Sequence, residues 1–297
     1  MGDPGVPNTS NKPSSSDDET HVGDQFEVPA YEPHPSSTTL KERIRHHYEL
    51  ASDYYYSLWG QHIHHAYFLS PTDTKETGQT NLINLLLEIS SLSPNSTVLD
   101  VGCGIGGTTR HLARDHGCTV TGITISGRQV QIAKRLTDNE SSSSTSTTTT
   151  TTTTPAAADK FTPIGTRGGR VAYQELDAEK MEFHFQPSSF DCVWISEALS
   201  HFPDKPLFFR NAARLLRPGG QGGKLVIADW FKAENLDAEA LETDIKPIEG
   251  TLHYPYLPYL HDSFQCPPFA FASAFFEKIL PFSFSRRTSE RKVPSER

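Results

Sequence analysis

Hydrophobic positions along the chain follow two periods, one helical and one typical of strands. The first helix is predicted at Thr38–Leu58, where Leu40, Ile44 and Tyr48 share one face. Downstream, the pattern predicts helices at 81–91, 108–115, 127–136 and 206–216, and strands at 97–101, 119–125, 171–176, 190–195 and 224–229. Alternating apolar strands and helices predict an α/β fold, a doubly wound, mostly parallel sheet with helices on both faces. In such sheets ligands bind at the carboxyl ends of the strands.

Polar segments set the limits of the predicted domain. Residues 1–37, rich in Ser, Pro, Asp and Thr, are expected to be a disordered tail. Residues 139–169 contain the run Thr147–Thr154 and are interpreted as a low-complexity surface insertion. The remaining 38–250 form the predicted domain, which begins with a helical lid at 38–96. Residues 251–297 form an atypical extension, with one possible helix at 270–280.

Charge and cysteine content narrow the class of partner. The 297 residues carry 27 basic and 36 acidic side chains, a formal charge of −9, so we expect no nucleic-acid partner. No apolar run is long enough for stable membrane insertion. The four cysteines form no CxxC pair, which argues against a disulfide framework or a zinc site and favours the cytoplasm. The oligomeric state stays open.

The most informative motif is the glycine loop after the first predicted strand. In Val98–Gly107, Gly102, Gly104 and Gly107 match the GxGxxG dinucleotide fingerprint. Asp100 precedes that loop, where a carboxylate would repel a pyrophosphate but suit a cationic group such as the ammonium of a methionine moiety. The ribose-reading position about 20 residues on holds Thr124 instead of an acidic residue. A glycine-rich turn that only packs strand against helix is the alternative.

These residues carry a resemblance to a known family. Val98–Ala113 resembles motif I of class I S-adenosylmethionine-dependent methyltransferases, and Gly122–Ser126 with Gln129 resembles the second motif of the branch that holds tocopherol and sterol C-methyltransferases. That branch also holds cyclopropane fatty-acid synthases and small-molecule N-methyltransferases of plants and fungi. Residues 47–67 and 194–205 are similar to its lid and to its motif after the fourth strand. The resemblance covers Thr38 to Glu249 and implies a Rossmann-like sheet.

The resemblance implies a set of contacts to S-adenosyl-L-methionine. Asp100, Gly102 and Gly104 would hold its methionine and ribose portion. Thr124 and Gln129 would bond the ribose hydroxyls, although an exposed helical position is an alternative for Gln129.

Two further cofactor contacts are implied. Asp177 and Ala178 would read the adenine amino group, against the alternative of a helix N-cap or turn at Asp177. Tyr48 would reach the methionine carboxylate, against the alternative of a buried core tyrosine.

Histidines around the expected site have two interpretations each. His62, His64 and His65 lack metal-ligand spacing, so they are interpreted as a segment that roofs the cofactor, and no metal is predicted. Glu197 and His201 are four apart and would share a face if that stretch were helical. His201 is a candidate catalytic base with Glu197 as its partner; a structural hydrogen bond between them is the alternative.

The expected activity is transfer of a methyl group from S-adenosylmethionine to carbon or nitrogen of a small, largely apolar metabolite. The family continues after residues 244–249 with a helix and two antiparallel strands, and no alternating pattern of that length follows here. The C-terminal strands are therefore expected to be missing or altered. A non-catalytic or weakly active remnant that lacks this wall of the substrate pocket is the alternative.

Overall fold

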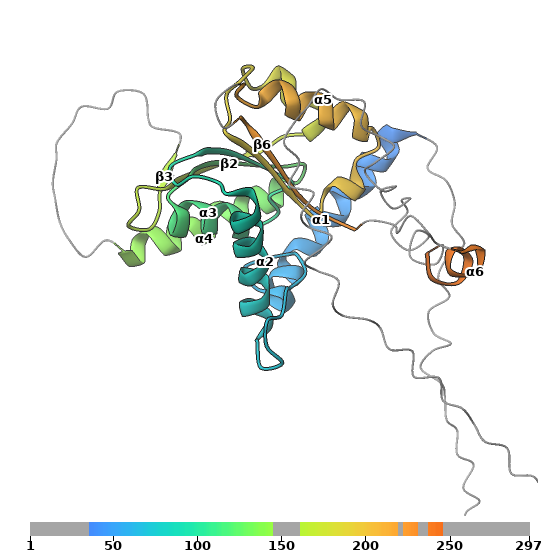
Figure 1. The fold of residues 1–297 in the computed structure, drawn as a ribbon, viewed down its shortest axis with the longest axis horizontal. Helices are drawn as coiled ribbons and strands as arrows, with labels where there is room; N and C mark the ends of the chain where they lie inside the picture. The colour runs from blue at the N-terminus through green and yellow to red at the C-terminus, as the bar shows by residue number, and fades with distance from the viewer. Residues whose placement is uncertain (1–35, 145–160, 219–221, 231–236, 246–297) are drawn as a thin grey trace, which may run out of the picture.

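The computed structural model describes residues 36–144, 161–218, 222–230 and 237–245, and its centre is a six-stranded sheet. The strands lie in the order β3-β4-β2-β1-β5-β6 (Figure 1). They are β1 Thr97–Val101, β2 Thr119–Thr124, β3 Thr162–Pro163, β4 Arg170–Glu175, β5 Cys192–Ser196 and β6 Lys224–Ala228. All pairs are parallel except β3 with β4. The predicted mostly parallel, doubly wound sheet is confirmed.

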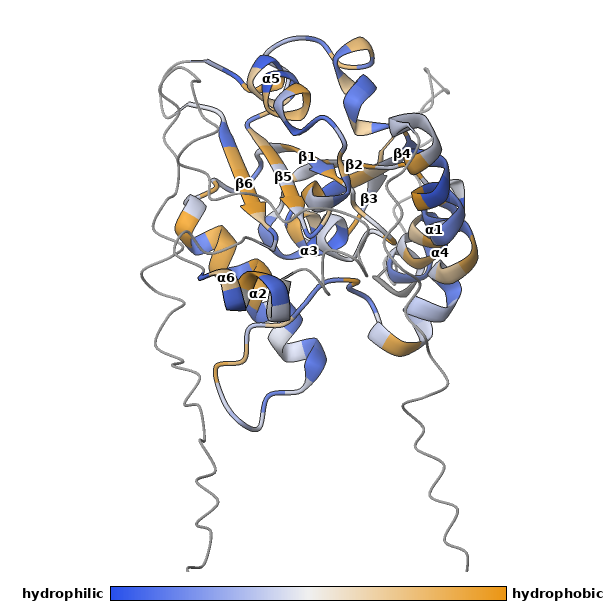
Figure 2. Cartoon of the chain, turned by 90° about the vertical axis from the view of Figure 1, so that its right-hand side faces the viewer, coloured by the Kyte–Doolittle hydropathy of each residue, from blue (hydrophilic) through white to orange (hydrophobic). Residues whose placement is uncertain are grey.

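Helices cover both faces of the sheet because successive strand residues point to opposite sides. Val98 packs with α2 (Lys75–Ser90), α3 (Gly107–His116) and α4 (Gly127–Ser144) on one face. Leu99 packs with α5 (Lys205–Leu215) and the short 3₁₀ helix η2 (Ala178–Phe183) on the other. The hydrophobic strands β5 and β6 therefore lie between two helical layers (Figure 2).

The strand order places a crevice at the end of β1. The sheet continues to β2 on one side of β1 and to β5 on the other, so the chain reverses its direction of winding there. The connection from β1 to β2 runs through α3 on one face and the connection from β4 to β5 runs through η2 on the other, so the two separate at the carboxyl end of β1, which is where ligands bind in sheets of this type. Helix α1 (Ser37–Trp59) packs beside α4, near that end.

Helix termini follow their local chemistry. Gly117 ends α3 with φ of 79°, a left-handed conformation that glycine adopts without strain. Ser126 caps α4 as predicted, because its Oγ accepts a hydrogen bond from the Gln129 N–H at 3.2 Å. The Thr74 side chain accepts from the Thr77 N–H at the start of α2.

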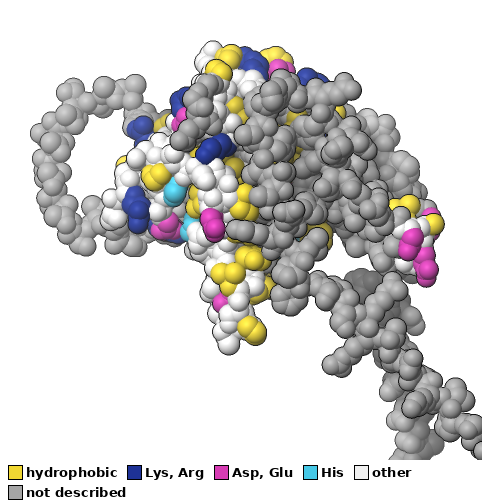
Figure 3. Space-filling model, in the orientation of Figure 1, with side chains coloured by type: hydrophobic (Ala, Val, Ile, Leu, Met, Phe, Trp, Pro, Cys, Tyr) yellow, Lys and Arg dark blue, Asp and Glu magenta, His cyan; other side chains and the backbone are white. Residues whose placement is uncertain are grey.

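Two elements extend beyond their predicted limits. Helix α2 begins six residues before the predicted Asn81, because its first turns are polar and carry no apolar periodicity. Helix α4 continues to Ser144, so the segment 139–169 is not wholly an insertion. Glu140 explains the extension, because it pairs with Arg110 at 2.8 Å and Arg114 at 2.8 Å on α3. Figure 3 shows basic and acidic side chains close together on the face that includes α3 and α4.

The remaining described elements are short. They are η3 (Leu199–His201), α6 (Ala238–Ala240) and the π-helical turn η4 (Leu241–Ile245). No helix within the described ranges is both long and apolar enough to cross a membrane. Residues 1–35 of the predicted tail, the whole run Thr147–Thr154 and the atypical extension with its possible helix lie outside the described residues. Within the described ranges β6 is one edge strand of the sheet and β3 is the other.

Candidate functional site

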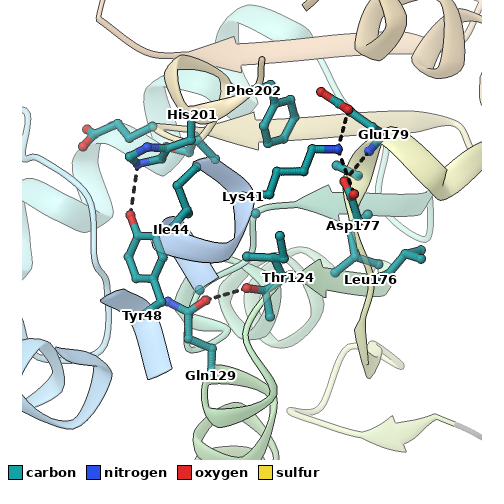
Figure 4. Close-up of a pocket in the computed structure, with 18 of the residues that line it drawn as sticks. Lys41, Ile44, Tyr48, Thr124, Gln129, Leu176, Asp177, Glu179, His201 and Phe202 are labelled. Atoms are coloured by element: carbon teal, nitrogen blue, oxygen red, sulfur yellow. Dashed lines mark hydrogen bonds and ion pairs between the residues drawn. The ribbon is translucent and has the colours of Figure 1, made fainter. Parts of the chain in front are cut away.

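A cavity of about 100 Å³ opens at the carboxyl ends of β1, β2, β4 and β5. Figure 4 shows side chains of α1, the strand ends and η3 converging on it. It brings together nine of the predicted site residues: Tyr48, Gly102, Gly104, Thr124, Gln129, Asp177, Ala178, Glu197 and His201. The tenth, Asp100, lines an adjoining cavity of about 30 Å³ that shares Gly102 and Gly104 with the first.

The glycine loop forms the floor of both cavities. Gly102 has φ of 72°, and a Cβ placed there would lie 2.4 Å from the Ala198 Cβ. The Gly102 and Cys103 N–H groups both donate to the Ile123 carbonyl, at 2.9 and 3.0 Å. The loop therefore turns tightly against β2 and leaves its backbone open to a ligand.

Asp100 lies in the middle of the sheet and is only 2% exposed. Its carboxylate accepts a hydrogen bond from the Thr109 hydroxyl at 2.5 Å. Burial raises its pKa to about 6, and the Thr109 bond offsets only part of that rise. A buried carboxylate with this pKa favours a cationic ligand, because a nearby positive charge stabilises its ionised form.

Thr124 and Gln129 lie side by side at the end of β2. The Thr124 hydroxyl donates to Gln129 Oε1 at 2.5 Å, and both side chains are buried (Figure 4). The alternative of an exposed helical Gln129 is wrong, because its side chain is only 4% exposed. One hydroxyl and one amide in contact offer both donors and acceptors to a diol.

Asp177 is the helix N-cap that was one of its two interpretations, and it also lines the cavity. Its Oδ1 accepts from the Glu179 N–H at 3.0 Å, which makes it the N-cap of η2. Its Oδ2 accepts from Lys41 of α1 at 2.9 Å, and the Lys41 ammonium also contacts Glu179 at 2.5 Å (Figure 4). The side chain therefore caps a helix and faces the cavity at the same time.

Tyr48 and His201 form a pair across the cavity. The Tyr48 hydroxyl lies 3.0 Å from His201 Nε2, and the two rings meet edge to face (Figure 4). Burial raises the pKa of the Tyr48 phenol and lowers the pKa of His201 to about 4. Both groups are therefore uncharged near neutral pH.

Glu197 is held by a different histidine from the one predicted. Its carboxylate accepts from the His65 N–H at 2.8 Å and lies 2.6 Å from His65 Nδ1. Glu197 has φ of 53° and precedes the short helix that contains His201, so the two do not share a helical face. The hydrogen bond with Glu197 raises the pKa of His65. The Glu–His pair of this site is thus Glu197 with His65.

The loop before α2 covers the start of α3. A Cβ on Gly107 would lie 2.1 Å from the Gln61 carbonyl oxygen and 2.7 Å from His62 Nδ1. Gln79, fully buried on α2, donates to the carbonyls of His62 at 2.8 Å and His64 at 3.1 Å. The described residues contain no group of three or more His, Cys, Asp or Glu placed to hold a metal ion.

Sequence reasoning missed Lys41, Glu179 and the partnership of His65 with Glu197. Lys41 lies on the polar side of an amphipathic helix, where a lysine is ordinarily solvated. Glu179 follows Asp177 by two residues, and that acidic pair after a strand is the only local signal of a cation partner. His65 stands in the histidine segment that was interpreted as a roof, and nothing in its spacing indicates a carboxylate 132 positions away.

Comparisons with known proteins agree with this geometry. A family model described as "Methyltransferase domain" matches residues 99–222, and one described as "Mycolic acid cyclopropane synthetase" matches residues 35–154. The chain is 33% identical over 226 residues to a 2-methyl-6-phytyl-1,4-hydroquinone methyltransferase of Synechocystis sp., covering 74% of this chain and 58% of that protein. It is 31% identical to a chloroplastic tocopherol O-methyltransferase of Arabidopsis thaliana, covering 70% of this chain and 55% of that protein.

A solved structure shares the fold. The crystal structure of the [4+2]-cyclase SpnF matches with a TM-score of 0.53 and 25% identity, covering 68% of this chain and 63% of that one. The chain spans between half and three fifths of the length of the two methyltransferases named above.

Proposed function

Since the chain belongs to the S-adenosylmethionine-dependent methyltransferases, we propose that it transfers a methyl group from that cofactor to a small, largely apolar metabolite. The supporting observation is the cavity that gathers every predicted cofactor contact except Asp100 from five separate parts of the sequence, with Asp100 in the adjoining cavity. The residues that line the larger cavity come from α1, the glycine loop, and the β2–α4, β4–η2 and β5–η3 connections. Residues with a purely structural role would not be expected to gather at the carboxyl edge of one sheet, which is where ligands bind in this type of fold.

The residues fit the parts of the cofactor in order along the crevice. Asp100 and the glycine loop suit the methionine end, Thr124 with Gln129 suits the ribose diol, and Asp177 beside Ala178 suits the adenine. Tyr48 lines the cavity beside His201, where it would contact the methionine carboxylate. These assignments combine the resemblance with the positions of the side chains.

Catalysis in this site requires that the two reactants be aligned and that water be excluded. When bound, the cofactor supplies a sulfonium methyl that is already activated for transfer. Holding two reactants in line is worth roughly 7–11 kcal/mol of barrier. Helix α1 and the His62–His65 loop would close the crevice over the reactants. His201 stays a candidate proton acceptor because its imidazole is neutral at pH 7, but burial lowers its pKa to about 4 and makes it a weaker base than an exposed histidine.

The acceptor atom is not fixed by the described residues. Carbon or nitrogen was expected, and the relatives include proteins named O-methyltransferases, so we extend the proposal to hydroxyl oxygen. The structural likeness to a protein named as a [4+2]-cyclase means that this fold also serves other chemistry. A non-catalytic remnant that binds cofactor weakly is therefore the alternative to be tested.

Calorimetric titration followed by a transfer assay tests the proposal. We expect S-adenosylhomocysteine to bind and NADH not to bind, and labelled S-adenosylmethionine to label a product in a screen of quinols, tocopherol-like phenols and amines. Binding without any labelled product across that screen would favour the remnant. Binding of NADH alone would reject both interpretations.

We further propose a cytoplasmic location. Cys103, Cys118 and Cys192 are free buried thiols, and burial raises the pKa of each. Buried cysteines that form no disulfide are typical of proteins in a reducing compartment.

A further inference from the structure

His64 presents an unused hydrogen-bond acceptor at the methionine end of the site. Its Nδ1 lies 2.8 Å from the His65 carbonyl oxygen, and because a carbonyl only accepts, Nδ1 carries a hydrogen. Burial lowers the pKa of His64, so the ring is neutral at pH 7. In the neutral ring with a protonated Nδ1, the Nε2 lone pair is an acceptor.

That lone pair has no hydrogen-bond partner among the described residues. His64 is 5% exposed, and its Nε2 is completely buried. Leaving a buried acceptor unsatisfied costs free energy, so a partner from outside the chain is expected to fill the role. Gln79 fixes the loop backbone here by donating to the carbonyls of His62 and His64, and the hydrogen bond from Nδ1 to the His65 carbonyl holds the ring.

The neighbours of His64 define what that partner must be. His64 lines the cavity of about 30 Å³ together with Asp100, Gly102, Thr108 and Ser196. This space is small, so it admits a small head group only. A carboxylate and an imidazole lone pair both accept hydrogen bonds, and the carboxylate adds negative charge. The cavity is therefore suited to a small cation with several N–H donors.

The smaller cavity adjoins the larger one. Both share Ile63, Gly102, Gly104 and Ser196, so a ligand that lies along the larger cavity can extend one end into the smaller. A primary ammonium has three N–H donors on a group about the size of water.

We propose that His64 is a cofactor-positioning residue whose Nε2 accepts a hydrogen bond from the ammonium of the methionine end of S-adenosylmethionine, with Asp100 as the charged partner. The inference rests on the proposed function, since it assigns one contact within that same site. It makes the histidine loop part of the binding site itself, because the loop supplies a specific acceptor to the amino-acid end.

Three ligands separate this role from a structural one. They are S-adenosylhomocysteine, its decarboxylated analogue, which keeps the ammonium, and methylthioadenosine, which lacks the amino-acid chain. We expect His64→Leu to weaken the first two by about 10- to 100-fold, the loss of one hydrogen bond to a charged group. Methylthioadenosine should change by less than about threefold, within ordinary context effects. His64→Gln keeps an amide oxygen as acceptor and should recover part of the loss.

Controls keep the outcomes distinct. Asp177→Asn acts at the opposite end and should weaken all three ligands by a similar factor. Thermal midpoints of each variant, followed by circular dichroism, report whether it folds. An equal loss for all three ligands in His64→Leu, or a loss confined to the ligand that carries the carboxylate, overturns the assignment while the proposed function stands. If the wild-type chain binds none of the three, both fail.

Discussion

At the scale of single residues, the buried carboxylate of Asp100 has the clearest thermodynamic consequence. Its pKa is raised to about 6, above the value of 3.8 for an exposed aspartate. Between these values the folded chain holds a proton that the unfolded chain has released. The group therefore favours folding fully below about pH 4, and this contribution is lost as pH rises through 6.

Replacement of Asp100 by Asn should remove this pH dependence. A shift of about two pKa units corresponds to roughly 3 kcal/mol of unfolding free energy. We expect the wild-type chain to lose that amount relative to Asp100→Asn between about pH 4 and pH 7. Urea unfolding of both proteins at several pH values measures the difference. A difference that stays constant across this range would contradict the burial of an ionising Asp100.

A second prediction concerns His65. The hydrogen bond that His65 donates to the Glu197 carboxylate raises the His65 pKa above 6.5, whereas burial lowers the pKa of His62 to about 3 and that of His201 to about 4. In an NMR titration His65 should be the histidine of this group that titrates above its ordinary value. Glu197→Gln removes the charge and should bring the His65 pKa down, with the His201 value nearly unchanged. An unmoved His65 pKa would show that the contact does not persist in solution.

At the scale of elements, Lys41 makes one of several polar contacts that attach α1 to the rest of the domain; Arg128 with Asp53 and Tyr48 with His201 are others. Lys41 joins α1 to the start of η2 through Asp177 at 2.9 Å and Glu179 at 2.5 Å. All three side chains are between 12% and 22% exposed, so solvent screens this contact less than it screens a surface pair. Its strength should set how often α1 leaves the cavity.

Lys41→Met should therefore loosen α1 without unfolding the sheet. A partly buried ion pair worth about 1 kcal/mol would speed the amide exchange of α1 by roughly fivefold. Hydrogen exchange measured by mass spectrometry resolves α1 from β1 and β5, whose rates should stay the same. Lys41→Arg keeps the charge and serves as the matched control. Equal acceleration in all elements would point to global destabilisation instead.

The sequence predicted the elements whose own residues determine them. Gly117 and Ser126 mark helix ends by local chemistry, and the apolar strand runs are long enough to recognise. The start of α2 was missed because its first turns are polar, although Thr74 marks it with a local N-cap, and the end of α4 was missed because Glu140 pairs with Arg110 and Arg114 on another helix. A helical turn that is stabilised by residues far away in the sequence shows no hydrophobic periodicity of its own.

The same distinction holds for the site. Asp100, Thr124 and Gln129 lie within one motif-bearing βαβ segment, so their neighbourhood could be predicted. The pairing of Glu197 could not be predicted. His201 follows Glu197 by four positions and was therefore the expected partner, whereas the folded chain places His65, from a loop 132 residues earlier, against the carboxylate. Left-handed φ at Glu197 turns its side chain out of the helical register that the spacing assumed.

At the scale of the whole molecule, the loop that crosses α3 has a consequence for cofactor choice. Dinucleotide enzymes seat the pyrophosphate on the first turn of the helix that follows the glycine loop. Here the Gln61 carbonyl stands over Gly107 with no room for a methyl group between them. The Gln61 carbonyl oxygen therefore crowds the first turn of α3, the turn on which dinucleotide enzymes bind the pyrophosphate. Replacing Thr124 by an acidic residue would therefore not by itself make this chain bind a nicotinamide dinucleotide. The loop that carries Gln61 would also have to be changed.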